Sequence, residues 1–87
     1  MYRVVFRRSA KKELDSLPKN VGDRITLAIA ALRETPRPSG CRKIVGSDNG
    51  YRIRIGRYRV IYEVRDKDRL VLIVRIVIRD ERAYRGL

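Results

Sequence analysis

The residues of this chain best suited to chemistry are arginines, and a group of them lies between positions 51 and 62. The stretch YRIRIGRYRVIY contains Arg52, Arg54, Arg57 and Arg59. A guanidinium group presents a planar fork of donors that matches the oxygens of a phosphate. Arginines gathered at one place would therefore suit a phosphodiester, although like charges facing each other across strands oppose folding.

The side chains that most often carry acid–base or metal chemistry are scarce. The sequence contains no histidine and a single cysteine, Cys41, which we interpret as a small, partly buried apolar residue in a chain from a reducing compartment. The chain thus lacks the usual general base near neutral pH and the commonest metal ligand. We expect no metal, no cofactor and no intrachain disulfide, and any reaction must use Arg, Lys, Tyr, Ser, Thr or carboxylates.

The overall charge points to a polyanionic partner. Lys and Arg number 22 against 10 Asp and Glu, a formal net charge of +12. A field of this size attracts polyanions, and the clustering of the arginines argues against a charge kept only for solubility. The 87 residues are expected to form one domain, 1–87. Neither an apolar run of membrane length nor a signal-peptide pattern is present, so we expect a cytoplasmic protein without membrane contact.

The N-terminal half is expected to supply one strand and two helices. Tyr2 to Phe6 is rich in β-branched and aromatic residues, as in a strand. Ser9 is predicted to cap a first helix, which Pro18 interrupts, and Pro18 or Asn20 opens a second. The second helix ends before Pro36. Its apolar stripe recurs at three- and four-residue steps: Val21, Ile25, Ala28, Ile29 and Leu32.

From Cys41 onward the apolar period changes to two, which indicates strands. The segments CRKIV, YRIRI, YRVIYEVR and LVLIVRIVI are predicted strands, and the near-continuous apolar run of the last predicts burial on both faces. SDNG and Gly56-Arg57 are turn signals. The order β-α-α-β-β-β(-β) predicts an α+β fold: a twisted, mostly antiparallel sheet with an N-terminal helical hairpin packed on one face.

The alternation of side chains along a strand predicts where the arginines point. If Gly56 and Arg57 form a two-residue turn, position 54 faces 59 and position 52 faces 61, so Arg52, Arg54 and Arg59 share one face. We expect them to be exposed there, at a phosphate site. The opposite face would be apolar and covered by the helices, with these residues: Tyr51, Ile53, Ile55, Tyr58, Val60, Tyr62 and Val64.

Several of these segments together resemble the RelE/ParE superfamily of bacterial and archaeal toxins. They are LPK before the second helix, ETPRPSGCRKIVG after it, the hairpin GYRIRIGRYRVIYEV and the ending RIVIRDERAYR. The resemblance implies the toxin of a toxin–antitoxin pair. For the RelE branch it implies an endoribonuclease that cuts mRNA in the ribosomal A site. It also implies a cognate acidic antitoxin as partner, and operator DNA bound only through the antitoxin complex.

The resemblance also implies site residues. In RelE-like toxins the active site comprises two basic residues on the third strand, an arginine on the fourth, and an arginine and a tyrosine near the C-terminus. The positions that match here are Arg52 and Arg54, Arg59, Arg79 and Tyr84, with the third-strand lysines of the best-known pattern replaced by arginines. Further RNA contacts are expected from the basic residues Lys43, Arg57 and Arg82.

A metal-free mechanism follows from these residues. The ribose 2′-OH would attack the adjacent phosphorus, while Arg52, Arg54 and Arg59 hold the phosphate and stabilise the phosphorane. Arg79 would neutralise or protonate the leaving oxygen, and Tyr84 would stack on a base. Arginine is a poor base because its pKa exceeds about 12. The general base stays unassigned; Glu63 and Lys43 are candidates, and we favour structural roles for both.

Two other functions fit the same sequence. A ParE-like toxin would share the fold and inhibit DNA gyrase without needing the arginine face. A non-catalytic basic module would bind nucleic acid and the antitoxin. Cuts inside translated codons, DNA damage with filamentation, or the absence of a phenotype would separate the three.

Overall fold

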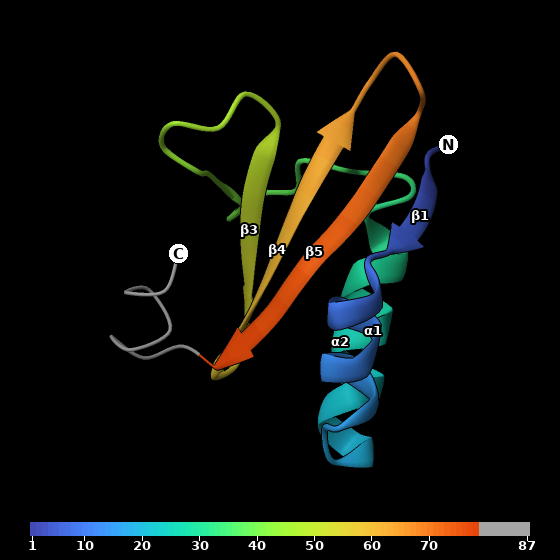
Figure 1. Cartoon of the computed structure of the whole chain (residues 1–87), viewed down its shortest axis with the longest axis vertical. Coiled ribbons are helices and arrows are strands. Elements are labelled where there is room, and N and C mark those ends of the chain that lie inside the picture. Colours follow the sequence, from blue (N-terminus) through green and yellow to red (C-terminus); the bar gives the residue numbers. More distant parts are fainter. Residues whose placement is uncertain (79–87) are drawn as a thin grey trace.

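The protein folds into two helices and a five-stranded mixed sheet (Figure 1). The structure is a computed structural model, which describes residues 1–78. The sheet has the order β1-β5-β4-β3-β2, with β1 parallel to β5 and every other pair antiparallel. The predicted α+β class and the mostly antiparallel sheet are confirmed. The elements are β1 Arg3–Phe6, α1 Arg8–Asp15, α2 Lys19–Ala31, β2 Arg42–Lys43, β3 Gly50–Ile55, β4 Tyr58–Arg65 and β5 Leu70–Ile78.

The helical hairpin covers one side of the sheet (Figure 1). Helix α1 starts at Arg8, and Arg7 before it is extended, with no side-chain cap; the prediction of a Ser9 cap was therefore wrong. The reason is that the Arg7 N–H still donates to the Ile73 carbonyl at 2.9 Å, so the helix begins directly after the last β1 bond. Pro18 occupies the N-cap of α2, where its fixed φ separates the two helices.

The core lies between the hairpin and the sheet. On β4, Val60, Tyr62 and Val64 are at most 1% exposed, and they face the helices as the alternation predicts. The Tyr62 hydroxyl donates to the Pro36 carbonyl at 2.8 Å, and burial raises the pKa of this hydroxyl. The other fully packed members of the core are Ala10, Ile25, Ile29, Leu32, Ile53, Val71, Ile73 and Ile76.

Strand β2 is shorter than predicted. Only Arg42 and Lys43 of the segment CRKIV pair with β3, because the chain then turns through Gly46, whose φ is +84°. The Lys43 ammonium fixes this turn by donating to the carbonyls of Ser47 and Asp48, both at 2.7 Å. The result is a short edge strand followed by a well-bonded loop.

Strand β5 lies between β1 and β4 and carries an irregularity. Ile61 pairs with Arg75 while Tyr62 pairs with Ile73, so Val74 is an extra residue, a β-bulge. The face of β5 toward the helices is buried and the other face is only partly exposed, so the prediction of burial on both faces holds in part. Between residues 1 and 78, no helix is both long and apolar enough to cross a membrane.

A polar cluster closes the end of the core near the N-terminus. Arg37 donates to both carboxylate oxygens of Asp66, at 2.8 and 3.3 Å, and to the Tyr51 hydroxyl at 2.9 Å. The Tyr2 hydroxyl donates to Asp66 at 2.6 Å. These hydrogen bonds, from Arg37 first and then from Tyr2, hold the pKa of Asp66 below its ordinary value. The cluster joins β1, the α2–β2 connection, β3 and the β4–β5 turn.

Candidate nucleic-acid interface

Arginines from three neighbouring strands lie on the sheet face opposite the helices. Arg54 on β3 is paired directly with Arg59 on β4, and Arg52 is paired with Ile61, as the two-residue turn at Gly56-Arg57 predicted. On the other side of β3, Arg42 is paired with Arg52. Paired residues project to the same face, with Cβ atoms about 5 Å apart. We call the four arginines 42, 52, 54 and 59 the arginine face.

The arginine face contains a hollow. A cavity of about 360 Å³ is lined by Gly40, Arg42, Arg52 and Arg54. Gly40 has a φ of +92°, which favours glycine over residues with a Cβ, and it leaves one wall of the hollow as bare backbone. Guanidinium groups around an open, polar concavity can bind a phosphate group from more than one side.

Arg59 differs from the prediction, which had it exposed; its side chain is only 5% exposed. The reason is its place on the central strand β4, between Arg54 of β3 and Val77 of β5. Arg54 is exposed as predicted, and Arg52 is partly exposed. A buried guanidinium has little conformational freedom, so Arg59 presents a charge in a fixed position beside the exposed Arg54.

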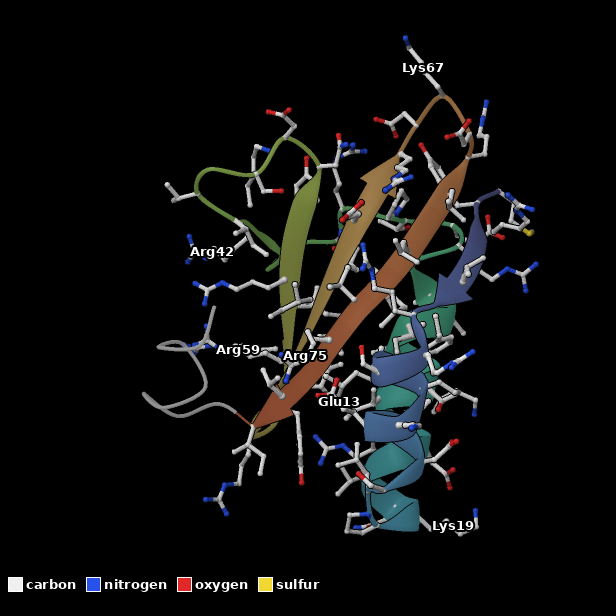
Figure 2. All side chains as sticks on the ribbon, in the orientation of Figure 1. Glu13, Lys19, Arg42, Arg59, Lys67 and Arg75 are labelled. Carbon is white, nitrogen blue, oxygen red and sulfur yellow. The ribbon has the colours of Figure 1, made fainter. Side chains whose placement is uncertain are left out.

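Lys43, from which an RNA contact was expected, does not lie on the arginine face. Lys43 pairs with Tyr51, on the opposite face from Arg52, and its ammonium lies 5.3 Å from the centre of the Tyr51 ring. Arg42 lies on the arginine face instead (Figure 2). The register of β2 against β3 places Arg42 beside Arg52. This register could not be predicted from the sequence, because a loop and not a tight turn connects the two strands.

Arg57 is exposed at the β3–β4 turn. Gly56 before it has a φ of +60°. A Cβ placed on Gly56 would lie 3.4 Å from Nη2 of Arg24 on α2, so Arg24 adds a second cation beside this turn, which the sequence did not indicate. The remaining predicted site residues, Arg79, Arg82 and Tyr84, lie outside the described residues.

The described residues offer few groups for proton transfer. Glu63 lies on the same sheet face as Arg59, and its Oε1 accepts hydrogen bonds from Arg65 at 2.9 and 3.2 Å. Within residues 1–78, no group of three or more His, Cys, Asp or Glu side chains could hold a metal ion. The chemistry available on this part of the chain is therefore the binding and electrostatic stabilisation of an anion.

The chain is similar in sequence and in structure to toxins of toxin–antitoxin systems. The family model described as the ParE toxin of type II toxin–antitoxin systems, parDE, matches residues 4–83. A proposed toxin of Methanocaldococcus jannaschii named RelE1 is 33% identical, over 98% of this chain and 97% of its own length. The RelE–RelB complex of Pyrococcus horikoshii contains a chain that is 34% identical with a TM-score of 0.82, covering 92% of this chain and 97% of that one. A chain of the RelB–RelE antitoxin–toxin complex from Methanococcus jannaschii is 27% identical, with a TM-score of 0.75, covering 95% of this chain and 98% of that chain.

Proposed function

Because this chain belongs to the RelE/ParE superfamily of toxins from toxin–antitoxin systems, we propose that it is an endoribonuclease that cleaves mRNA on the ribosome without a metal ion. One observation carries this proposal: the cross-strand pair of Arg54 and Arg59, extended through Arg52 to Arg42, gathers guanidinium groups on a single face. A phosphodiester bound on this face could accept hydrogen bonds from several guanidinium groups at once.

The proposed reaction begins with attack of the ribose 2′-oxygen on the adjacent phosphorus. The bond from phosphorus to the 5′-oxygen breaks, giving a 2′,3′-cyclic phosphate and a 5′-hydroxyl. Arg52 and Arg54 bind the nonbridging oxygens, and the buried Arg59 stabilises the negative charge of the phosphorane from a fixed position. A fixed charge is effective because it needs no reorganisation during the reaction.

The two residues beyond β5 complete the proposed site. Arg79 would neutralise or protonate the leaving 5′-oxygen, and Tyr84 would stack on a base and orient the nucleotide. The 2′-OH would lose its proton mainly because nearby guanidinium groups lower its pKa, since arginine itself is protonated at neutral pH. No general base is assigned.

The ribosome supplies what this small domain lacks. In-line attack requires the RNA to be bent, and a small sheet without a dedicated base has little means of bending it. A decoding centre that holds mRNA in a fixed shape would meet this need. We therefore expect weak cleavage of free RNA and strong cleavage of translated mRNA.

The proposed partner is a cognate acidic antitoxin. The similar chains from Pyrococcus horikoshii and Methanococcus jannaschii were solved in complexes with RelB. A chain with a formal net charge of +12 has a strong electrostatic attraction for an acidic protein. Operator DNA would be bound only through the complex of the two proteins.

Gyrase inhibition is the second candidate, favoured by the description of the matching family model as a ParE toxin. Expression from a tightly controlled promoter, with mapping of the 5′ ends of cellular mRNA, separates the two. Cuts inside translated codons that disappear in Arg54→Ala, but persist in the control Lys67→Ala at the exposed β4–β5 turn (Figure 2), would support the proposal. Filamentation with DNA damage and intact mRNA would overturn it in favour of gyrase, and no phenotype would favour a binding module.

A further inference from the structure

The carboxylate of Glu13 joins α1 to β5, just beyond the point where β5 stops pairing with β1. Strand β1 pairs with β5 only from Leu70 to Ile73, so among residues 1–78 no strand lies beside the following part of β5 on that edge. There Oε1 of Glu13 accepts the backbone N–H of Ile76 at 2.9 Å. Oε2 accepts a hydrogen bond from Nε of Arg75 at 3.0 Å and forms an ion pair with its Nη2 at 2.9 Å. Figure 2 shows Glu13 of α1 next to Arg75.

The contact of Glu13 with β5 lies between a β-bulge and the residue of β5 that is paired with Arg59. The bulge at Val74 lies one residue before Arg75. Bulges bend a strand and re-aim its side chains, and they are frequent beside active sites. After the bulge, Val77 pairs with Arg59, and Ile78 is the last described residue before Arg79. The register of these few residues therefore sets which residue of β5 lies beside Arg59.

That register depends on few interactions. Past Ile73, β5 keeps its ladder to β4, but the described part of the chain supplies no second strand to oppose a slip by one residue. A slip by one position would move every side chain to the other face, taking Ile76 out of the core and Val77 away from Arg59. Glu13 opposes such a slip because it bonds the backbone of Ile76, whose side chain is 4% exposed, and the side chain of Arg75 together.

We propose that Glu13 is a positioning residue of the RNA site: its carboxylate holds β5 in its register after the bulge, and so keeps Val77 beside Arg59 and fixes the place of the Arg59 guanidinium for the reaction. This inference depends on the proposed ribonuclease function. Glu13 is 27% exposed at its side chain, lies on α1 and bonds two residues of β5, so the inference gives it an effect on the reaction through β5 and not by contact with the RNA.

The expected result is a loss in the chemical step with little change in binding. Glu13→Ala should lower kcat for cleavage of ribosome-bound mRNA by about tenfold or more, because a small displacement of reacting groups can cost up to about a hundredfold. KM should change by less than about twofold, since the arginines that bind phosphate remain. Glu13→Gln retains an acceptor for Ile76 and should lose less activity than Glu13→Ala.

The matched control is Glu34→Ala, which removes an exposed carboxylate that forms no ion pair within residues 1–78. Both variants raise the net charge by one, so a change common to both comes from charge alone. Only Glu13→Ala should reduce kcat. An equal loss in both variants would overturn the inference.

A second measurement does not depend on cleavage. Amide hydrogen exchange in the whole chain should show faster exchange at Ile76 in Glu13→Ala, with unchanged exchange at Val60 in the core. If the wild type fails to cleave mRNA while Ile76 loses protection, the proposed function is wrong and the bond itself stands. If the wild type cleaves and the folded Glu13→Ala variant keeps full kcat, or if Ile76 exchange is unchanged in Glu13→Ala, the inference is wrong.

Discussion

The two faces of the sheet are built from alternate residues of the same strands, yet they differ in almost every physical respect. On β4, Val60, Tyr62 and Val64 meet the helices and are buried. Arg59 and Glu63 of the same strand project to the other face, opposite Arg54 and Gly50 of β3. One face excludes water with apolar side chains, and the other gathers cations where a hydrophobic neighbour would have stabilised the fold more.

The comparison teaches that the covered face provides the stability on which the arginine face depends. Burial of one large apolar side chain contributes roughly 1.5–3 kcal/mol. Repulsion between two exposed guanidinium groups costs about 1 kcal/mol or less, and it is screened less at Arg59, which is 5% exposed. A handful of well-packed residues can therefore offset several unfavourable arginine pairs, and variants on the two faces should have opposite effects on stability and activity.

The largest effect on stability is expected from the covered face. Tyr62→Ala should lower the free energy of unfolding by about 3–5 kcal/mol, because it leaves a cavity and removes the donor to the Pro36 carbonyl. Urea denaturation monitored by circular dichroism measures this. The control Tyr62→Phe keeps the ring and should cost only about 1 kcal/mol. A loss below about 1 kcal/mol in Tyr62→Ala would show that the covered face is not the source of stability.

The reverse pattern is expected for Arg54→Ala on the exposed arginine face. Cleavage of translated mRNA should fall about a hundredfold, the size found when one stabilising donor of a transition state is removed. The free energy of unfolding should change by less than about 0.5 kcal/mol, since the side chain is exposed. Primer extension on ribosome-bound mRNA gives the first quantity, and Arg54→Lys, which keeps the charge, should retain part of the activity. Unfolding of Arg54→Ala would contradict the contrast between the faces.

A smaller and more discriminating test uses two neighbours on β2. Arg42→Ala should weaken RNA binding several-fold. A plot of the logarithm of the binding constant against the logarithm of the salt concentration should become less steep by about 0.7, which corresponds to the loss of one phosphate contact with single-stranded RNA. Lys43→Ala should leave this slope unchanged and lower stability by about 1 kcal/mol, because its hydrogen bonds go to Ser47 and Asp48. Filter binding over a salt series compares the two, and equal slopes would remove Arg42 from the site.

The smallest effect concerns pH. Asp66 has a pKa below its ordinary value of 3.8, chiefly because Arg37 donates to it. Its contribution to stability is therefore complete above that value and is lost as the pH falls through the lower folded value. Between about pH 5 and pH 2.5 the melting temperature of the wild type should fall more than that of Asp66→Asn. Parallel curves would show that this cluster does not hold the end of the covered face.

Much of the fold could be predicted because its signals are local. Pro18 separates two helices wherever they pack, and Gly56-Arg57 fixes the hairpin register that pairs Arg54 with Arg59. The cap of α1 and the length of β2 could not be predicted in this way. Arg7 bonds to Ile73, distant in sequence, and β2 ends where a loop of its own takes the chain away from β3.

The site shows the same division. Strand alternation alone placed Arg52, Arg54 and Arg59 on one face. Lys43 was expected at the site because it is close in sequence, whereas the pairing of β2 with β3 puts Arg42 on that face. The burial of Arg59 depends on β5 lying on its other side, which no pattern around position 59 records. Arg24 and Glu13 were missed because each comes from a helix and meets a residue far along the chain, Gly56 of the β3–β4 turn and Ile76 of β5.

The sequence by itself determined the charge, the lack of histidine and the alternation that separates basic from apolar side chains, because these depend only on residue type and on neighbours a few positions away. The tertiary structure decided which cations share a surface, which of them is buried, and that a carboxylate of α1 holds the end of β5. Those features arise from pairing between distant segments, whose register is set by the packing of the whole domain.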